Sequence, residues 1–180
     1  MNWWQITLLV VGVLLVVVLV MYLLSLIIAY FALKKFAMRI ETRKRSIDVL
    51  LSQKYDVLVL VARIFKKNHV QMPSDFEDEL SPNMEGNLKK LTLTERMTIR
   101  SFLMKTTQTI LYYAAQNPSI SEDNEFLVLK RSLLEIDENY RKAITLYNAD
   151  AVGYNYWIGK KIAYPLRKLG HFEEKQVIVG

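Results

Sequence analysis

Apolar residues fill the N-terminal part of the chain, where no Lys, Arg, Asp, Glu or His occurs between Met1 and Leu33. As a helix, the run from Ile6 to Leu33 would rise roughly 40 Å, against ~30 Å for the hydrocarbon core of a bilayer. The run is too long for a signal peptide, no basic segment precedes it, and no A-x-A-like cleavage site follows it. The pattern therefore predicts a single transmembrane anchor over residues 1–38, retained in the mature chain.

Aromatic and basic residues flank this predicted span. Trp3 and Trp4 precede it, and Tyr30 and Phe31 lie near its other end, where amphipathic rings favour the membrane interface. The basic residues that follow are Lys34, Lys35, Arg39, Arg43, Lys44 and Arg45. By the positive-inside rule, we expect the N-terminus outside and the rest of the chain in the cytoplasm. The same basic residues suit anionic lipid head groups, and the small residues Ser25 and Ala29 are a weak indication of a homo-oligomer.

Beyond the span, apolar residues recur every three or four positions, which is the period of an α-helix. A first stripe, containing Ile47, Leu51 and Leu58, places Lys54 off its apolar face. Prolines and acidic residues interrupt the pattern after residue 67, with a short helix expected from Ser74. A second long helix is expected from Thr92 to the Asn117-Pro118 pair, and a third from Ser119, which forms a capping-box pattern with Glu122. We therefore expect an all-α fold.

The architecture expected from these patterns is a transmembrane helix followed by an antiparallel bundle of three long helical segments and a short one. The bundle is expected over residues 39–164, and residues 165–180 form a basic and aromatic tail. On the last helix, large side chains recur every seven residues and form a stripe along one face. Its members are Phe126, Leu133, Tyr140, Tyr147 and Tyr154, with a companion series of Leu129, Ile136, Ala143 and Asp150.

Three polar positions on this last helix need an explanation. Asp150 lies within the stripe, and a buried carboxylate needs a partner, such as a tyrosine hydroxyl or a Lys or Arg of the first helix. The alternative is that the stripe is open to solvent at this position. Asn148 and Asn155 lie one step off the stripe, each directly after a tyrosine. We expect their amides to bond a neighbouring helix or to remain in water, as structural rather than catalytic groups.

The order of these features resembles the C-terminal signature of the LemA family, which has a proline turn, a helix start and two Tyr-Asn pairs seven residues apart. The matching residues here are Pro118, Phe126, Leu129, Leu133, Tyr147, Asn148, Tyr154 and Asn155. Residues 46–61 also resemble the family's first soluble helix, although the Pro-Asn pair expected after Tyr55-Asp56 is missing. The resemblance implies a single-pass membrane protein with a cytosolic antiparallel helical bundle and no established enzymatic activity. One branch of the family is associated with magnetosome membranes.

The C-terminal tail combines aromatic and basic residues. Those singled out as a lipid or partner surface are Trp157, Lys160, Lys161, Arg167 and Lys168. Such a mixture suits a membrane surface, and a plain solvated surface is an equal alternative. Nucleic acid is a less favoured partner, because no recognisable nucleic-acid motif accompanies the positive charge, a net +6 for the chain.

Catalytic chemistry finds little support in the sequence. There is no Cys, and neither His69 nor His171 belongs to an H-E-x-x-H pattern. No glycine-rich phosphate loop or G-x-S-x-G elbow occurs. We therefore predict no catalytic, cofactor-binding or metal-binding residue. The favoured function is a scaffold or adaptor that binds another protein at the membrane. The alternative is a membrane-shaping or anionic-lipid-binding bundle, including a role at magnetosome membranes, and an unrecognised hydrolase is disfavoured.

Overall fold

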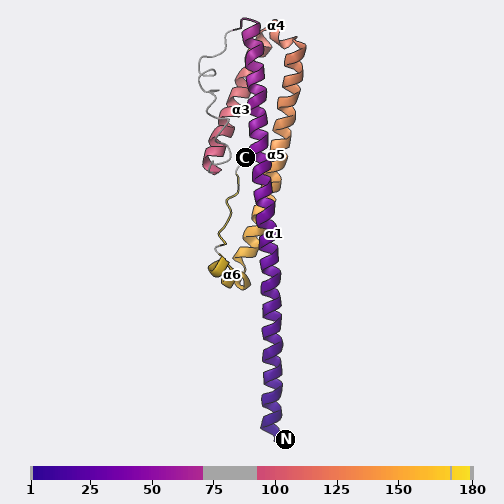
Figure 1. The fold of residues 1–180 in the computed structure, drawn as a ribbon, viewed down its shortest axis with the longest axis vertical. Coiled ribbons are helices and arrows are strands. Elements are labelled where there is room, and N and C mark those ends of the chain that lie inside the picture. Colours follow the sequence, from indigo (N-terminus) through magenta and orange to yellow (C-terminus); the bar gives the residue numbers. More distant parts are fainter. Residues whose placement is uncertain (1, 71–92, 171, 179–180) are drawn as a thin grey trace. The chain divides into compact units, whose positions relative to one another are not determined.

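The structure is a computed structural model that describes residues 2–70, 93–170 and 172–178. These residues form helices, and no strand occurs among them. The elements are α1 (Trp3–Lys67), α3 (Leu93–Gln116), α4 (Pro118–Ser121), α5 (Asn124–Gly159), the 3-10 helix η3 (Lys161–Ala163) and α6 (Tyr164–Gly170) (Figure 1). The predicted all-α fold is confirmed. The short helix expected from Ser74 and the expected helix start at Thr92 lie outside the described residues.

The chain divides into two compact units, and α1 and α5 each contribute to both. The first, here the anchor unit, comprises Met1–Thr42 and Leu146–Gly180. The second, here the three-helix unit, comprises Arg43–Thr145.

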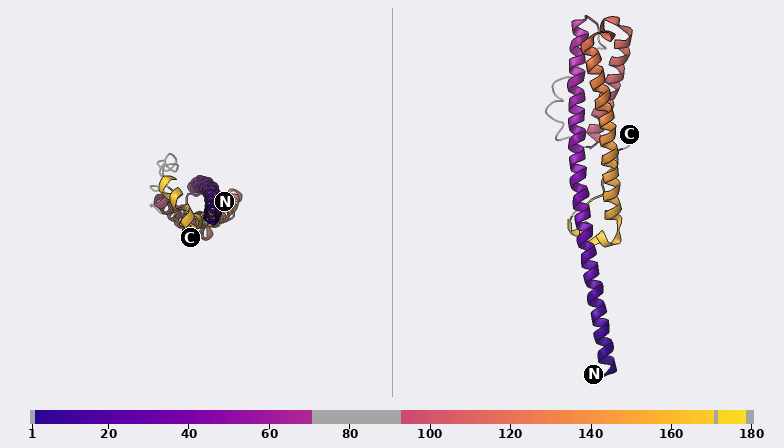
Figure 2. Two further views of the ribbon diagram at one scale, coloured as in Figure 1. Left: turned by 90° about the horizontal axis from the view of Figure 1, so that it is seen from below. Right: turned by 90° about the vertical axis from the view of Figure 1, so that its right-hand side faces the viewer.

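In the three-helix unit, each long helix contacts the other two. An ion pair joins Asp48 of α1 to Arg96 of α3, and another joins Lys54 of α1 to Asp137 of α5. Arg100 of α3 lies over the ring of a tyrosine of α5. α3 runs parallel to α1, and the short helix α4 turns the chain so that α5 runs antiparallel to both (Figures 1 and 2). The side chains buried between them include Ile47, Leu51, Leu58, Val61, Phe65, Leu103, Ile110, Ile120, Phe126 and Leu133. The predicted apolar stripes are therefore the core of this unit.

The start of α5 differs from the prediction. Residues 118–121 form the separate helix α4, and Pro118 occupies its first turn. α5 begins at Asn124, and its cap is Asp123, whose Oδ1 accepts hydrogen bonds from the backbone N–H of Glu125 (2.7 Å) and Phe126 (3.2 Å). An aspartate accepting from the second and third helical residues is a strong N-cap. The Ser119–Glu122 pattern therefore did not mark the start of α5, because Ser119 lies inside α4.

α1 ends in a capping arrangement that the sequence did not reveal. The backbone N–H of Val70 donates to the carbonyl of Phe65, and that of His69 donates to the carbonyl of Lys66, both at 3.1 Å. These two bonds define a Schellman motif, in which the residue after the helix adopts a left-handed conformation. His69 fills this position with a φ of 54°. His69 thus ends α1.

In the anchor unit, the side chains of α1 begin to be buried after Ile28. None of the side chains from Asn2 to Ile28 is buried, although nearly all are apolar. This stretch is long and apolar enough to cross a membrane. The predicted span continued to Leu33, but Ala29 and Leu33 are fully buried within the anchor unit. Ala29 is therefore already covered by its own chain, which weakens the small-residue indication of a homo-oligomer.

α5 runs antiparallel to α1 within the anchor unit. Arg39 of α1 lies 3.7 Å from Asp150 of α5, and Phe36 lies against Gly153. A Cβ atom at residue 153 would come within 2.7 Å of the Phe36 ring, so a glycine lets this ring rest on the backbone of α5. Residues further along α5 therefore lie beside residues earlier in α1.

Candidate functional site

The two Tyr-Asn pairs of α5 hold the last described part of the chain, Phe172–Ile178, here the C-terminal segment. Asn148 Nδ2 donates to the carbonyl of Ile178 (2.8 Å), and the N–H of Ile178 donates to Asn148 Oδ1 (2.9 Å). Asn155 makes the same two bonds with Lys175, both at 2.8 Å. Each amide thus satisfies the backbone donor and acceptor of a single residue. The Tyr147 hydroxyl adds a hydrogen bond to the carbonyl of Gln176 (2.9 Å).

The spacing of the two asparagines matches the spacing of the residues they hold. Seven residues of α-helix rise about 10.5 Å, at about 1.5 Å per residue. Three residues of extended chain span about 10 Å, at about 3.3 Å per residue. Asn148 binds the later residue, Ile178, and Asn155 binds the earlier one, Lys175, so the C-terminal segment runs antiparallel to α5. The seven-residue repeat on the helix is therefore in register with a three-residue repeat on the extended chain.

Burial along the C-terminal segment follows the same three-residue repeat. Phe172, Lys175 and Ile178 are buried or half-buried, and the four residues between them are exposed. The segment forms neither helix nor strand, so no regular element pairs its backbone groups. The two asparagines supply a donor and an acceptor to Lys175 and to Ile178.

Each inward-facing residue of the C-terminal segment meets a defined group. The ring of Phe172 packs edge-on against Tyr30 of α1, with centroids 6.4 Å apart. The ammonium of Lys175 lies 5.6 Å from the centroid of the Tyr154 ring, within the range of a cation–π contact. Ile178 is 5% exposed. The five residues that receive the segment, Tyr30, Tyr147, Asn148, Tyr154 and Asn155, are here called the clamp.

Two further features stabilise the clamp. Burial raises the pKa of the Tyr154 phenol, and the carboxylate of Glu173 raises it further. Tyr147 and Tyr154 are each 1% exposed, which fixes the asparagines that directly follow them. The prediction that both tyrosines are core residues is confirmed.

The asparagines have a different partner from the one expected. The sequence predicted that they bond a neighbouring helix or remain in water, whereas they bind the backbone of an extended segment 20 to 30 residues later in the chain. The only signal on the helix was their spacing, because the groups that they bond are peptide groups rather than side chains. By contrast, Asp150 has one of the partners considered for it: Arg39 of the first helix lies 3.7 Å away, and Asp150 is 9% exposed.

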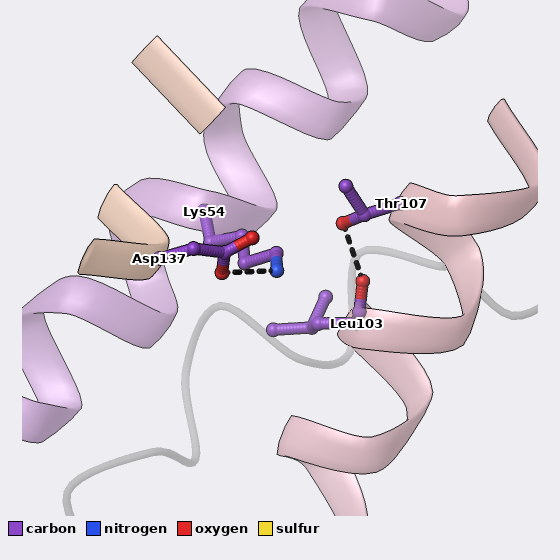
Figure 3. Close-up of polar contacts among 4 residues, drawn as sticks. All are labelled: Lys54, Leu103, Thr107 and Asp137. Carbon is purple, nitrogen blue, oxygen red and sulfur yellow. Dashed lines mark hydrogen bonds and ion pairs between the residues drawn. The ribbon is translucent and has the colours of Figure 1, made fainter. Parts of the chain in front are cut away.

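The three-helix unit holds its own buried polar contacts. Lys54 is 3% exposed, and its ammonium lies 2.6 Å from Asp137 Oδ1 (Figure 3). The prediction that Lys54 lies off the apolar face is wrong. Lys54 is three residues after Leu51 and four before Leu58, which places it on the stripe. Thr107 is also buried, and its hydroxyl donates a hydrogen bond to the carbonyl of Leu103 in the same helix (Figure 3).

Arg100 of α3 lies over the ring of Tyr140 of α5, 5.3 Å from its centroid. Burial raises the pKa of Tyr140, with the Arg100 charge opposing that shift and the Asp48 carboxylate adding to it. The pocket between Lys54, Arg100 and Tyr140 has room for about one water molecule. It is therefore a packing gap and too small for an organic substrate.

The residues predicted at the membrane interface all lie on α1. Trp3, Trp4, Tyr30 and Phe31 are exposed, as are Lys34, Lys35, Arg39 and Arg45, while Arg43 and Lys44 are half-buried. The residues predicted as a lipid or partner surface lie at the end of α5, in η3 and in α6. Lys161, Arg167 and Lys168 are exposed, and Trp157 and Lys160 are half-buried. The Lys160 ammonium lies over the rings of Tyr156 and Trp157, at 4.4 and 4.5 Å from their centroids.

Within the described parts of the chain, acidic and histidine side chains do not gather in threes as metal ligands would. Comparisons with models of protein families, with curated proteins and with solved structures found no match. The clamp, which binds a segment of chain through defined contacts, is the candidate functional site.

We predict that replacing either asparagine by alanine frees its end of the C-terminal segment. Each change removes two hydrogen bonds, and a net ~1 kcal/mol per bond makes local opening about tenfold or more easier. Hydrogen exchange measured by mass spectrometry should show faster exchange over residues 172–178 in Asn148→Ala and Asn155→Ala. Asn139→Ala, an exposed position on the same helix, is the matched control and should leave this exchange unchanged. Equal exchange in all three variants would mean that the clamp does not hold the segment.

Proposed function

We propose that this protein is a LemA-like, single-pass membrane protein whose helical bundle acts as a non-enzymatic scaffold or adaptor at the cytoplasmic face. The observation that carries the proposal is the largely exposed apolar stretch from Trp3 to Ile28, within a helix that continues to Lys67. Exposed apolar surface of this extent is not stable in water and suits a bilayer. The basic residues that follow it favour a cytoplasmic location for the remainder.

The anchor's connection to the folded body supports a structural role. Burial begins at Ala29, directly after the exposed stretch, so no linker separates the proposed span from packed residues of the same unit. A partner bound to this body would be held close to the membrane surface. The ordered Tyr-Asn signature, which resembles that of the LemA family, supports the same architecture.

The polar groups of the bundle support binding rather than catalysis. Lys54, Asp137 and Asp150 take part in ion pairs between helices. The pocket beside Lys54 is too small for a substrate, whereas the clamp binds a length of peptide backbone. An arrangement of this kind suits recognition of another protein.

The orientation of the chain can be tested by labelling single cysteines, because the natural sequence has none. We expect Asn2→Cys to react with a membrane-impermeant maleimide in intact cells. Asp56→Cys, at an exposed position on α1, should react only after the membrane is permeabilised. The opposite labelling would place the bundle outside and contradict the cytoplasmic role.

The adaptor role predicts a defined binding partner. The tagged full chain, cross-linked in cells and purified in detergent, should retain one or a few proteins in amounts comparable with its own. A tagged chain shortened to the proposed anchor, residues 1–38, is the control for membrane background. Recovery of the same proteins with both chains would count against an adaptor.

The runner-up function is binding of anionic lipid by the end of α5 and α6. It is favoured by the packing of Lys160 on Tyr156 and Trp157, beside the exposed cations of η3 and α6. The register set by Phe36 and Gly153 places Trp157 at the level of Ala32 of α1, close to the proposed membrane surface. Rings and cations at that level suit the head-group region.

Trp157 can report on this second function, because the chain has only two other tryptophans, Trp3 and Trp4. In the double variant Trp3→Phe, Trp4→Phe, reconstituted in nanodiscs with brominated lipids, we expect stronger quenching of Trp157 with anionic than with neutral lipid. The difference should shrink as salt is added and in Arg167→Ala, Lys168→Ala, since screening and loss of charge weaken the attraction. Quenching that is independent of lipid charge would remove this candidate.

A further inference from the structure

The C-terminal segment is held mainly through its backbone. All five hydrogen bonds that join it to the clamp involve a peptide N–H or C=O of Lys175, Gln176 or Ile178. Backbone groups are the same in every residue except proline, so this recognition does not depend on the sequence of the segment. Main-chain bonds that supply affinity, with side chains that supply specificity, are the mode by which many domains bind extended peptides.

Side-chain contacts add a simple specificity. The segment presents an aromatic ring, a cation and an aliphatic side chain at every third position: Phe172 to Tyr30, Lys175 to Tyr154, and Ile178 into a buried site. The intervening residues Glu173, Glu174, Gln176 and Val177 are exposed. The clamp therefore selects a pattern of aromatic-x-x-basic-x-x-aliphatic and tolerates change at the positions between.

We infer that the clamp is a docking site for an extended segment of a partner protein with this pattern, and that the C-terminal segment occupies it as an internal ligand. The inference rests on the proposed adaptor function and names the kind of partner. Tethering gives the internal ligand an effective concentration on the order of millimolar, so a free peptide competes poorly until the segment is released. The resting chain is thus closed to partners, and release of its C-terminal segment opens it.

The test uses the full chain in nanodiscs and a fluorescent peptide with the sequence of residues 171–180, HFEEKQVIVG. Ile178→Asp in the protein places a carboxylate in a buried site, which should release the internal segment. Anisotropy should then show binding of the free peptide at least tenfold tighter than to the natural chain. Val177→Asp introduces the same charge at the exposed neighbouring position and should behave as the natural chain does. Equal affinity for the two variants would overturn the inference.

N-methylated peptides test the backbone contacts with one and the same protein, so the folding of a variant cannot explain the outcome. Against Ile178→Asp, methylation of the Lys175 or Ile178 nitrogen should weaken binding at least tenfold, because these N–H groups donate to the asparagines. Methylation at Val177 should have little effect. Alanine at Phe172, Lys175 or Ile178 of the peptide should weaken binding more than alanine at Glu173 or Gln176. Loss of affinity that ignores this three-residue pattern would contradict the assigned mode.

Two further outcomes separate this inference from its alternatives. If the natural chain formed a dimer that Ile178→Asp abolished, the occupant would be the segment of a second copy, and the assignment to a different partner would be wrong. If the cross-linked full chain retained a partner equally well with Ile178→Asp, Asn148→Ala and the natural sequence, the adaptor function would stand and the clamp would not be its docking site.

Discussion

The seven-residue stripe of buried side chains on α5 is the constraint on which both units depend. In the three-helix unit, Phe126 and Leu133 fill the core, and in the anchor unit Tyr147 and Tyr154 do so. Burying a large apolar side chain stabilises a fold by roughly 1.5–3 kcal/mol, so this one stripe supplies a substantial part of each unit's stability. It also fixes the rotation of α5 about its axis. The direction in which each neighbouring side chain leaves the helix is therefore fixed as well.

That fixed rotation explains how two ordinary amides become a clamp. Asn148 and Asn155 follow the buried tyrosines, so both leave the helix in one direction, two turns apart. An amide has donors and an acceptor side by side, and it can pair with the N–H and C=O of a single residue. A second amide two turns away reaches a residue three further along an extended chain. The spacing required for helix packing thus also suits backbone recognition.

The sequence predicted those parts of the structure that depend on helical period. The all-α class, the buried tyrosines and the place of Asp150 on the buried stripe follow from it. It failed where a local competitor or a distant partner decides. Ser119 lies inside α4, so Asp123 caps α5, and Lys54 is buried on the stripe as an ion pair with Asp137. The clamp was not predicted, because its asparagines bond peptide groups, which are the same in every residue except proline. The three-residue pattern of Phe172, Lys175 and Ile178 is not a helical period and therefore gave no signal.

The clamp's place in the anchor unit connects the two candidate functions. Tyr30 receives Phe172 at the point on α1 where exposed apolar residues give way to buried ones. Under the proposed orientation, this point lies at the cytoplasmic membrane surface, where aromatic rings are favoured. An emptied clamp would leave Tyr30 and the free Phe172 able to enter the interface, and lipid would then favour the released state. Membrane contact and partner docking would reinforce each other. Both favour the state in which the C-terminal segment has left the asparagines.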